Sequence, residues 1–208
     1  ARDRILQIHK AAVQSAGGVP LVLGIARDQV DDITTKIHAA RDARADFLLT
    51  SAGVSVGEFD LVKKVLAAEG EIGFWRVRMK PGKPLAFGRI HGMPHLGLPG
   101  NPVSSLLSFE LMARPAILAM QGRTRLHRPL VEAVFDDEVR RKDDRRHYLR
   151  VIVEMKDGVY HARLTGEQGS GILTSMARAN GLLIVSEYAT RAQRGERLPV
   201  IMLDWPEQ

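Results

Sequence analysis

The spacing of apolar residues near the start of the chain predicts two helices and two strands. Apolar side chains recur every three or four positions over residues 5–16 and again over residues 30–40, which is the period of a helix with one buried face. The glycine pair at positions 17 and 18 ends the first of these helices. Residues 19–25 and 47–50 form short continuous apolar runs, which are typical of strands buried on both faces. The chain therefore opens with an alternation of helix and strand.

A third helix is predicted over residues 55–68. Ser55 and Glu58 have the spacing of a capping box, in which the two side chains satisfy backbone N–H groups of the first turn, and Gly70 marks the end of the helix. Three further strands follow this helix in the prediction, at residues 74–79, 85–90 and 95–98.

The next helix is predicted from Asn101 to Met120. Asn101 suits the N-cap position, and Pro102 suits the first turn, where a missing N–H leaves no bond unmade. Pro115 lies inside the same helix, where its ring removes a backbone hydrogen bond. We therefore expect a kink or break near Ala113.

These elements predict an α/β domain over residues 1–124, with a mostly parallel sheet and helices on both of its faces. After Thr124 the pattern changes to short β-rich runs separated by turn sequences, one of which, Asp157-Gly158, is the dipeptide of a two-residue hairpin. Residues 125–208 are therefore expected to form a small all-β domain, either a barrel or a sandwich. Its predicted strands lie at residues 131–139, 148–155, 159–164, 182–186 and 198–203.

Composition restricts the class of protein. The 208 residues include no cysteine, which excludes disulfides, cysteine zinc sites and thiol nucleophiles. Hydrophobic residues make up 45% of the chain and charged residues 26%, which is the balance of a globular protein. No run of about 18 apolar residues predicts a membrane span, and no segment resembles a signal peptide, so a cytoplasmic protein is expected.

The positive charge is concentrated in one stretch of the chain. The formal net charge is +6, yet residues 72–101 contain no Asp or Glu and hold five basic residues, which are Arg76, Arg78, Lys80, Lys83 and Arg89. This local excess predicts an anionic ligand. Aromatic residues make up only 5% of the chain, which argues against stacking on single-stranded nucleic acid.

The first candidate site for such a ligand is the loop over residues 50–60, between a predicted strand and a predicted helix. Open α/β sheets bind ligands beyond the carboxyl ends of their strands, and glycines let the backbone approach a ligand closely. Glu58 and Asp60 have the oxygen ligands to hold a divalent cation shared with phosphate. A tight turn with a capping glutamate and a solvated aspartate accounts for the same residues, so both interpretations stay open.

The second candidate is the turn M-K-P-G-K-P over residues 79–84. Its prolines and glycine stiffen the backbone, which lowers the entropy lost when Lys80 and Lys83 bind an oxyanion or a phosphate. A solvated hairpin tip, with lysines that serve solubility, is the alternative.

The third candidate is the loop over residues 97–104, which passes through glycines into a capped helix. The helix amides and the hydroxyls of Ser104 and Ser105 suit a phosphate. Helix capping alone accounts for Asn101 and Pro102, but less well for the two glycines.

Asp28 follows the predicted strand over residues 19–25, and there it suits a metal or a substrate, or serves as a helix cap. The histidines are weaker candidates. His91 and His95 are four residues apart, but Gly92 and Pro94 lie between them, so they do not share a helical face. We expect the histidines at the surface or in the core.

The sequence closely resembles the molybdopterin molybdenumtransferase family, which includes bacterial MoeA and the E domain of gephyrin. The resemblance rests on three motifs in the family's order and spacing, namely S-A-G-V-S-V-G-E-F-D (51–60), M-K-P-G-K-P-L-A-F-G (79–88) and G-L-P-G-N-P-V-S (97–104). Two further motifs resemble the C-terminal domain of the family, namely R-R-H-Y-L-R (145–150) and G-S-G-I-L-T-S-M-A-R-A-N-G (169–181). The resemblance covers essentially the whole chain.

The resemblance implies an enzyme of molybdenum cofactor biosynthesis, which inserts molybdate into adenylylated molybdopterin and releases AMP with the help of Mg²⁺. It implies catalytic roles for Asp60, Lys80 and Lys83, with Asp28 and Asp60 as the ligands of the cation. It also implies a substrate site built from the three loops and the C-terminal domain, which comprises Ser51, Gly53, Ser55, Gly57, Glu58, Pro81, Gly82, Gly97, Pro99, Gly100, Asn101, Pro102, Ser104, Arg150 and Ser175.

The sequence departs from the family pattern at two points. The family usually reads S-G-G where this chain has Ser51-Ala52-Gly53, and Ala52 is unfavourable if its position needs a positive φ. Family members are also longer, with a T-G-D-E-like motif at the end of a strand ahead of the first helix. The chain is therefore expected to be the C-terminal portion of the enzyme, without the first strand of the α/β sheet and poorly active alone.

Two other functions stay open: a molybdopterin-binding adenylyltransferase, against which the C-terminal β domain argues, and a scaffold without catalysis, as in gephyrin. The resemblance implies small-molecule substrates, a homodimer in the full-length protein and contacts with other proteins of molybdenum cofactor biosynthesis. No nucleic acid or membrane is expected as a partner.

Overall fold

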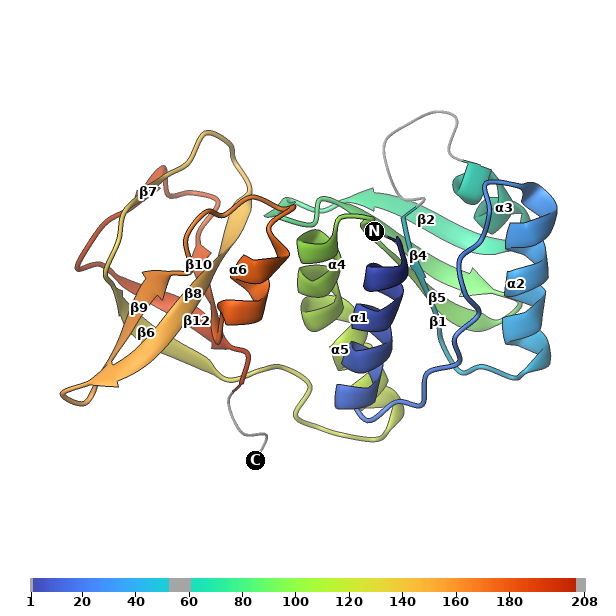
Figure 1. The fold of residues 1–208 in the computed structure, drawn as a ribbon, viewed down its shortest axis with the longest axis horizontal. Helices are drawn as coiled ribbons and strands as arrows, with labels where there is room; N and C mark the ends of the chain where they lie inside the picture. The colour runs from blue at the N-terminus through green and yellow to red at the C-terminus, as the bar shows by residue number, and fades with distance from the viewer. Residues whose placement is uncertain (1, 53–60, 205–208) are drawn as a thin grey trace. The chain divides into compact units, whose positions relative to one another are not determined.

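The structure is a computed structural model that describes residues 2–52 and 61–204. The chain forms two compact units (Figure 1). The first comprises residues 1–77 and 82–126, and the second comprises residues 78–81 and 127–208. Residues 78–81 therefore pack with the second unit, although the chain on both sides of them belongs to the first. The domain ranges 1–124 and 125–208 stay a prediction from the sequence.

The helices predicted at the start of the chain are confirmed. They are α1 (Arg2–Ser15) and α2 (Val30–Asp42), and the buried residues of α2 are Ile33, Ile37 and Ala40, at the spacing of one helical face. The described part of the third helix is α3 (Leu61–Glu69), which ends before Gly70 as predicted. The predicted capping box of Ser55 and Glu58 lies outside the described residues.

The sheet of the first unit is mixed, so the expectation of a mostly parallel sheet was wrong. Its strand order is β1-β5-β4-β2, with bounds β1 (Leu48–Ser51), β5 (Met93–Leu98), β4 (Pro84–Ile90) and β2 (Gly70–Arg76). Only β1 and β5 are parallel among these neighbours, whereas β5 with β4 and β4 with β2 are antiparallel. The turn His91-Gly92, with φ of 49° and 81°, joins β4 directly to β5. Such a short connection can join only antiparallel strands.

Residues 19–25 do not form the predicted buried strand. Val19 is 97% exposed and Leu21 54%. Gly24 has a φ of 76°, which interrupts an extended path, and Pro20 has no N–H to donate to a ladder. The segment instead runs along α2, where Lys36 Nζ donates to the Leu23 carbonyl over 2.8 Å. An apolar run becomes a strand only where a neighbouring strand offers backbone partners, and no described strand pairs with this one.

Helices cover both faces of the sheet, as predicted (Figure 1). On one face α2 and α3 pack with Leu48, Ile90 and Met93. On the other face α1 and the helices after β5 pack with Leu96 and Leu98. The sheet is therefore the middle layer of three.

The predicted break near Ala113 takes the form of a π-helical turn. The helix after β5 consists of α4 (Pro102–Ser108), the π turn η1 (Phe109–Ala113) and α5 (Arg114–Met120). The wider turn lies directly ahead of Pro115, where a regular helix would miss a donor and meet the proline ring.

Among the described residues, Pro102–Met120 is long and apolar enough to cross a membrane by length and composition alone, with a mean hydropathy of 1.3. However, 56% of that window is buried in the protein, and Phe109, Ala113 and Ile117 lie in the core. A core helix passes the same test, so this is weak evidence for a membrane span.

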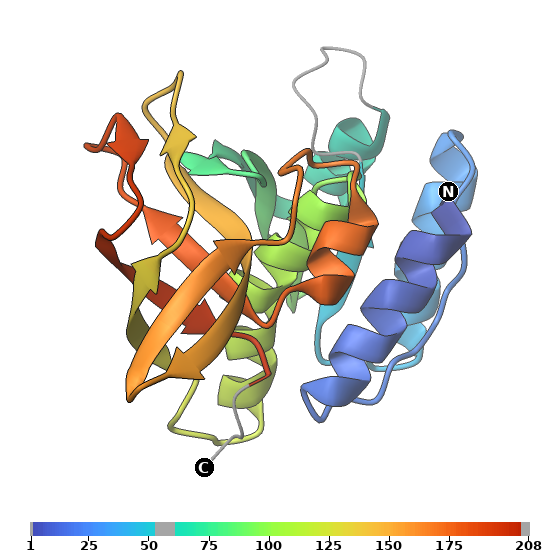
Figure 2. The ribbon, with the colours of Figure 1, turned by 60° about the vertical axis from the view of Figure 1, so that its left-hand side comes forward.

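The second unit is built on a small β barrel (Figure 2). Its strands follow the order β10-β12-β6-β9-β8, and β10 pairs with β8 to close the ring. The bounds are β6 (Leu130–Phe135), β8 (Arg146–Lys156), β9 (Val159–Leu164), β10 (Gly181–Val185) and β12 (Arg197–Met202). The predicted hairpin is confirmed, because Asp157 and Gly158 join β8 to β9 with φ of 49° and 78°.

Three short strands and a helix complete the second unit. β3 (Met79–Lys80) adds to β8 in parallel, and β7 (Val139–Arg140) pairs with β11 (Arg191–Ala192). The helix α6 (Leu173–Arg178) was not predicted, so the unit is not entirely β.

Candidate active site

Two of the three predicted loops meet at the carboxyl ends of β1 and β5. The parallel register pairs Ser51 with Leu98, the last residue of each strand. Beyond that pair, Ser51 Oγ donates to the Pro99 carbonyl over 3.3 Å, and the Ala52 N–H donates to the Leu98 carbonyl over 3.1 Å. The loops after the two strands therefore lie side by side at the edge where open α/β sheets bind ligands.

Ala52 occupies the left-handed region, with a φ of 72°. A glycine would adopt this conformation without the clash that an alanine Cβ brings. The loop after β5 lies close to Ala52, because a Cβ built on Gly100 would stand 3.1 Å from the Ala52 Cβ. A side chain at Gly100 would therefore make a tight contact with Ala52, which the loop after β1 could relieve only by moving a few tenths of an ångström.

The third loop continues from the buried strand end into a helix. Gly97 lies in β5 between Thr50 and Ala86, and Pro99 is buried. Asn101 takes the N-cap position with an extended backbone, and its carbonyl accepts the Ser105 N–H over 2.8 Å. Its side chain makes no capping hydrogen bond to the helix.

The helix that follows holds Pro102 in its first turn and then the two serines. Ser104 is buried. The Ser105 hydroxyl lies 2.7 Å from His9 Nε2 of α1, so this hydroxyl, one of the two predicted to meet a phosphate, has a partner inside the unit.

The lysine turn is divided between the two units. Gly82, with a φ of 106°, and the exposed Lys83 belong to the first unit, where the Lys83 carbonyl accepts the Val77 N–H over 2.8 Å. Lys80 and the buried Pro81 belong to the second unit.

Lys80 forms an ion pair with Asp143 inside the second unit. Lys80 Nζ donates to Asp143 Oδ2 over 3.1 Å, and Asp143 also accepts from Arg145 Nη2 and lies 2.9 Å from His147 Nε2. The hydrogen bond from Arg145 above all, with those from His147 and Lys80, holds the pKa of Asp143 well below its usual range. The side chain of Lys80 remains 48% exposed. Asp143 therefore holds the ammonium in place, and its negative charge offsets part of the positive potential that Lys80 presents to solvent.

Arg150 and Ser175, predicted from the C-terminal motifs, are in direct contact. Arg150 is 2% exposed on β8, and its Nε donates to Ser175 Oγ over 3.0 Å. Its Nη2 donates to the Gly169 carbonyl over 3.0 Å, and burial lowers the pKa of Arg150. Both bonds lie inside the second unit, where they attach α6 and the preceding loop to the barrel.

The predicted cation ligands are described only in part. Asp28 is exposed in the bend before α2, whose N-cap is Gln29 rather than Asp28. Other predicted site residues lie outside the described residues, and these are Gly53, Ser55, Gly57, Glu58 and Asp60.

Two histidines of the first unit contact hydroxyl groups near the candidate edge. His95 is fully buried on β5, with Nε2 3.0 Å from the Thr50 hydroxyl, and burial lowers its pKa to about 4. Burial likewise lowers the pKa of His9 to about 4. Both rings are therefore neutral at pH 7. No local pattern marks these contacts, because the partners are 45 and 96 residues apart.

The chain belongs to the family described as "Probable molybdopterin binding domain", whose model matches residues 1–119. Residues 132–203 match the "MoeA C-terminal region (domain IV)". The order of the two matches is the order of the two units along the chain.

The relatives are named for molybdenum cofactor biosynthesis. The chain is 32% identical over 167 residues to the molybdopterin molybdenumtransferase of Haemophilus influenzae, covering 79% of this chain and 41% of the relative. It is 30% identical over 207 residues to gephyrin of Dictyostelium discoideum, covering 88% of this chain and 29% of the relative. The crystal structure of the molybdopterin biosynthesis MoeA protein of Pyrococcus horikoshii superposes with a TM-score of 0.79 at 29% identity, covering 96% of this chain and 47% of that one. The chain thus spans less than half the length of these relatives.

Proposed function

We propose that this chain works in molybdenum cofactor biosynthesis as part of a molybdopterin molybdenumtransferase. The reaction is the insertion of molybdate into adenylylated molybdopterin with release of AMP. The observation that carries the proposal is the meeting of the loops after β1 and β5 at one edge of the sheet, through Ser51 and Pro99, in a chain of this family. That edge offers close backbone approach and helix amides to a phosphorylated ligand.

The lysines supply the charge that both substrates require. Molybdate and the pyrophosphate link of the adenylylated substrate are anions. Negative charge also develops on AMP as it leaves. Ammonium groups fixed near that charge stabilise the transition state more than mobile water does. Lys80 is pre-positioned by Asp143, and Lys83 is exposed on the stiff turn that follows.

The proposal also includes Mg²⁺. Hard cations such as Mg²⁺ prefer carboxylate oxygens, so Asp28 has suitable chemistry. A single described carboxylate does not make a cation site, and no step of the reaction is therefore assigned to the ion.

The proposal is tested by replacing both lysines in the complete protein. Lys80→Ala plus Lys83→Ala is expected to weaken binding of adenylylated molybdopterin at least about 10-fold, since two charge-assisted contacts are lost. The matched control is Lys10→Ala plus Lys156→Ala, which changes the net charge equally at exposed positions outside the three loops. Equal binding and equal molybdate-dependent cofactor synthesis in the two double variants would contradict the lysine assignment.

Further parts of the proposal concern the complete protein. We propose that it is a cytoplasmic homodimer that binds other proteins of molybdenum cofactor biosynthesis. This chain alone is proposed to catalyse the reaction poorly. Light scattering of the complete protein tests the dimer. The similarity to gephyrin keeps a scaffold role as the second candidate. A protein that supports no molybdate insertion under conditions where a bacterial relative does so would favour the scaffold.

A further inference from the structure

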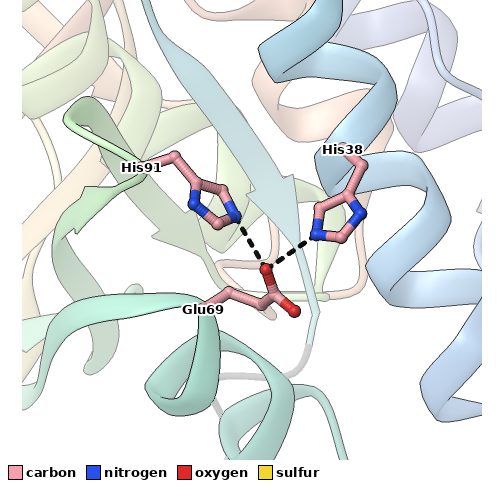
Figure 3. A group of neighbouring side chains, drawn as sticks. All are labelled: His38, Glu69 and His91. Atoms are coloured by element: carbon pink, nitrogen blue, oxygen red, sulfur yellow. Dashed lines mark hydrogen bonds and ion pairs between the residues drawn. The ribbon is translucent and has the colours of Figure 1, made fainter.

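Three side chains with metal-binding atoms meet at the edge of the first unit, from three different elements (Figure 3). His38 lies on α2, Glu69 is the last residue of α3, and His91 lies in the turn between β4 and β5. The two imidazole nitrogens point toward the same carboxylate oxygen. His38 Nε2 lies 3.0 Å and His91 Nε2 2.7 Å from Glu69 Oε2, and the ligand atoms all fall within 4.8 Å of one another.

The donor set suits a late first-row divalent metal, and zinc in particular. Two imidazoles and one carboxylate form a three-ligand zinc set that leaves a fourth position for water. Zinc ligands stand about 2.0–2.2 Å from the ion, so that neighbouring ligands are about 3.4 Å apart. The present separations of 2.7 Å, 3.0 Å and at most 4.8 Å lie on both sides of that value. The rings cross at 62° with centroids 5.5 Å apart, so they converge on the carboxylate rather than stack on each other.

The backbone next to this cluster is anchored in the apolar core, while the ligand atoms remain accessible. Ile37, Leu66 and Ile90 lie next to or near the three side chains in sequence, and all of them are buried in one core cluster. The side chains of His38, Glu69 and His91 are 38%, 17% and 30% exposed, which leaves a path for an ion and a water.

The cluster is separate from the candidate active site. β5 runs from Met93 to Leu98, and the candidate loops lie beyond its Leu98 end. His91 precedes the other end of β5, and six strand residues span about 20 Å at about 3.3 Å each. The cluster therefore lies at the opposite edge of the sheet.

We propose that His38, Glu69 and His91 form a zinc site that ties α2, α3 and the β4–β5 turn together. The site goes beyond the proposed transferase activity, because none of its ligands belongs to the loops at the other edge. Its ligands are 31 and 22 residues apart along the chain, so the ion would cross-link segments that otherwise meet through apolar contacts and the shared carboxylate. Zinc binds through the Nε2 lone pair of each imidazole, so each ring must carry its proton on Nδ1 when the ion is bound.

The test uses the 208-residue chain without a histidine tag and Zn²⁺ alone as the probe. Competition with a chromogenic chelator at neutral pH is expected to give one tight equivalent of zinc per chain. The variants are His91→Asn, which keeps a residue that tolerates the φ of 49°, and Glu69→Gln, which keeps the shape without the charge. Each is expected to lower zinc affinity at least about 100-fold, because one of three protein ligands is lost.

The matched control is His161→Gln. His161 also lies 2.9 Å from a carboxylate, that of Asp136, but without a second histidine, so this variant should bind zinc as the unchanged chain does. Equal zinc affinity in the unchanged chain and His91→Asn would overturn the proposal, and the triad would then be a hydrogen-bonded brace. Binding of Co²⁺ to the unchanged chain is a second test, and it does not depend on whether a variant folds. Absorption bands of four-coordinate cobalt are expected in the unchanged chain, and their absence would also overturn the site.

Discussion

The Nε of Arg150 donates a hydrogen bond to the hydroxyl of Ser175 over 3.0 Å, inside a unit where both side chains are buried. Ser175 in turn donates to the Ile172 carbonyl over 2.7 Å, so the hydroxyl links the barrel strand β8 to the first turn of α6. A buried guanidinium is costly unless its N–H groups are bonded. Arg150 and Ser175, which the family resemblance assigns to the substrate site, therefore also have a structural role.

Ser175→Ala is expected to lower the free energy of unfolding by about 1–3 kcal/mol, because a buried charged donor loses its acceptor. Urea unfolding followed by circular dichroism measures the change. The control is Ser15→Ala, whose exposed hydroxyl bonds only within its own helix, and it should stay within about 0.5 kcal/mol. Equal stability of Ser175→Ala and the unchanged chain would show that the bond contributes nothing.

Ala52→Gly is expected to stabilise the protein. The φ of 72° costs an alanine about 1–2 kcal/mol, and the greater freedom of glycine in the unfolded chain returns part of this, for a net gain of about 0.5–1 kcal/mol. Ala43→Gly is the control, since Ala43 has a φ of −76° and should lose stability on the same substitution. We expect the melting temperature to rise in Ala52→Gly and to fall in Ala43→Gly. A fall in both variants would rule out strain at Ala52.

His95 is expected to make the fold sensitive to acid. Its pKa falls from 6.5 to about 4 on folding, so the unfolded chain binds a proton between those values that the folded chain does not. Stability therefore declines as the pH drops from about 6.5 toward 4, by an amount on the order of 3 kcal/mol.

His95→Gln, which keeps a donor for Thr50 but does not titrate, should flatten that part of the profile in urea unfolding at several pH values. His127→Gln, at an exposed position, should leave the slope as it is. An unchanged slope in His95→Gln would place the acid sensitivity elsewhere, and His9 would be the next histidine to replace, because burial lowers its pKa to about 4 as well.

Asp143→Asn is expected to destabilise the second unit and release Lys80. The charged bonds to Arg145, His147 and Lys80 are weakened together, at a cost of about 2 kcal/mol near neutral pH. Because folding lowers the pKa of Asp143, its contribution is present above the pKa of an unfolded aspartate and is lost as the pH falls below it. The difference in unfolding free energy between the unchanged chain and the Asp143→Asn variant should therefore shrink in acid.

The neighbouring Asp144→Asn is the control for that change. Asp144 also forms an ion pair, with Arg78 over 2.9 Å, but its side chain is 79% exposed, and such surface pairs contribute little. A similar loss of stability in both variants would mean that Asp143 acts through general charge and not through its three partners.

Local patterns predicted the helices well and the strand directions poorly. Periodic burial of Ile33, Ile37 and Ala40 is a property of one segment, so it can be recognised in the sequence. Whether β4 and β5 run parallel depends on the turn that joins them, and whether residues 19–25 form a strand depends on a neighbour elsewhere in the chain. The helix α6 was missed because it has six residues and no side-chain cap, too little for a periodic pattern.

The sequence by itself determined the longer helices, the family resemblance and the loops that carry candidate chemistry, because these depend on spacing within short segments. It also identified Ala52 as the position where a positive φ would cause strain. The tertiary structure alone decided that Ser51 meets Pro99, that Asp143 holds Lys80 and that His38, Glu69 and His91 share one point. Such contacts join residues 22 to 63 positions apart through strand register and helix packing, and no local pattern encodes them.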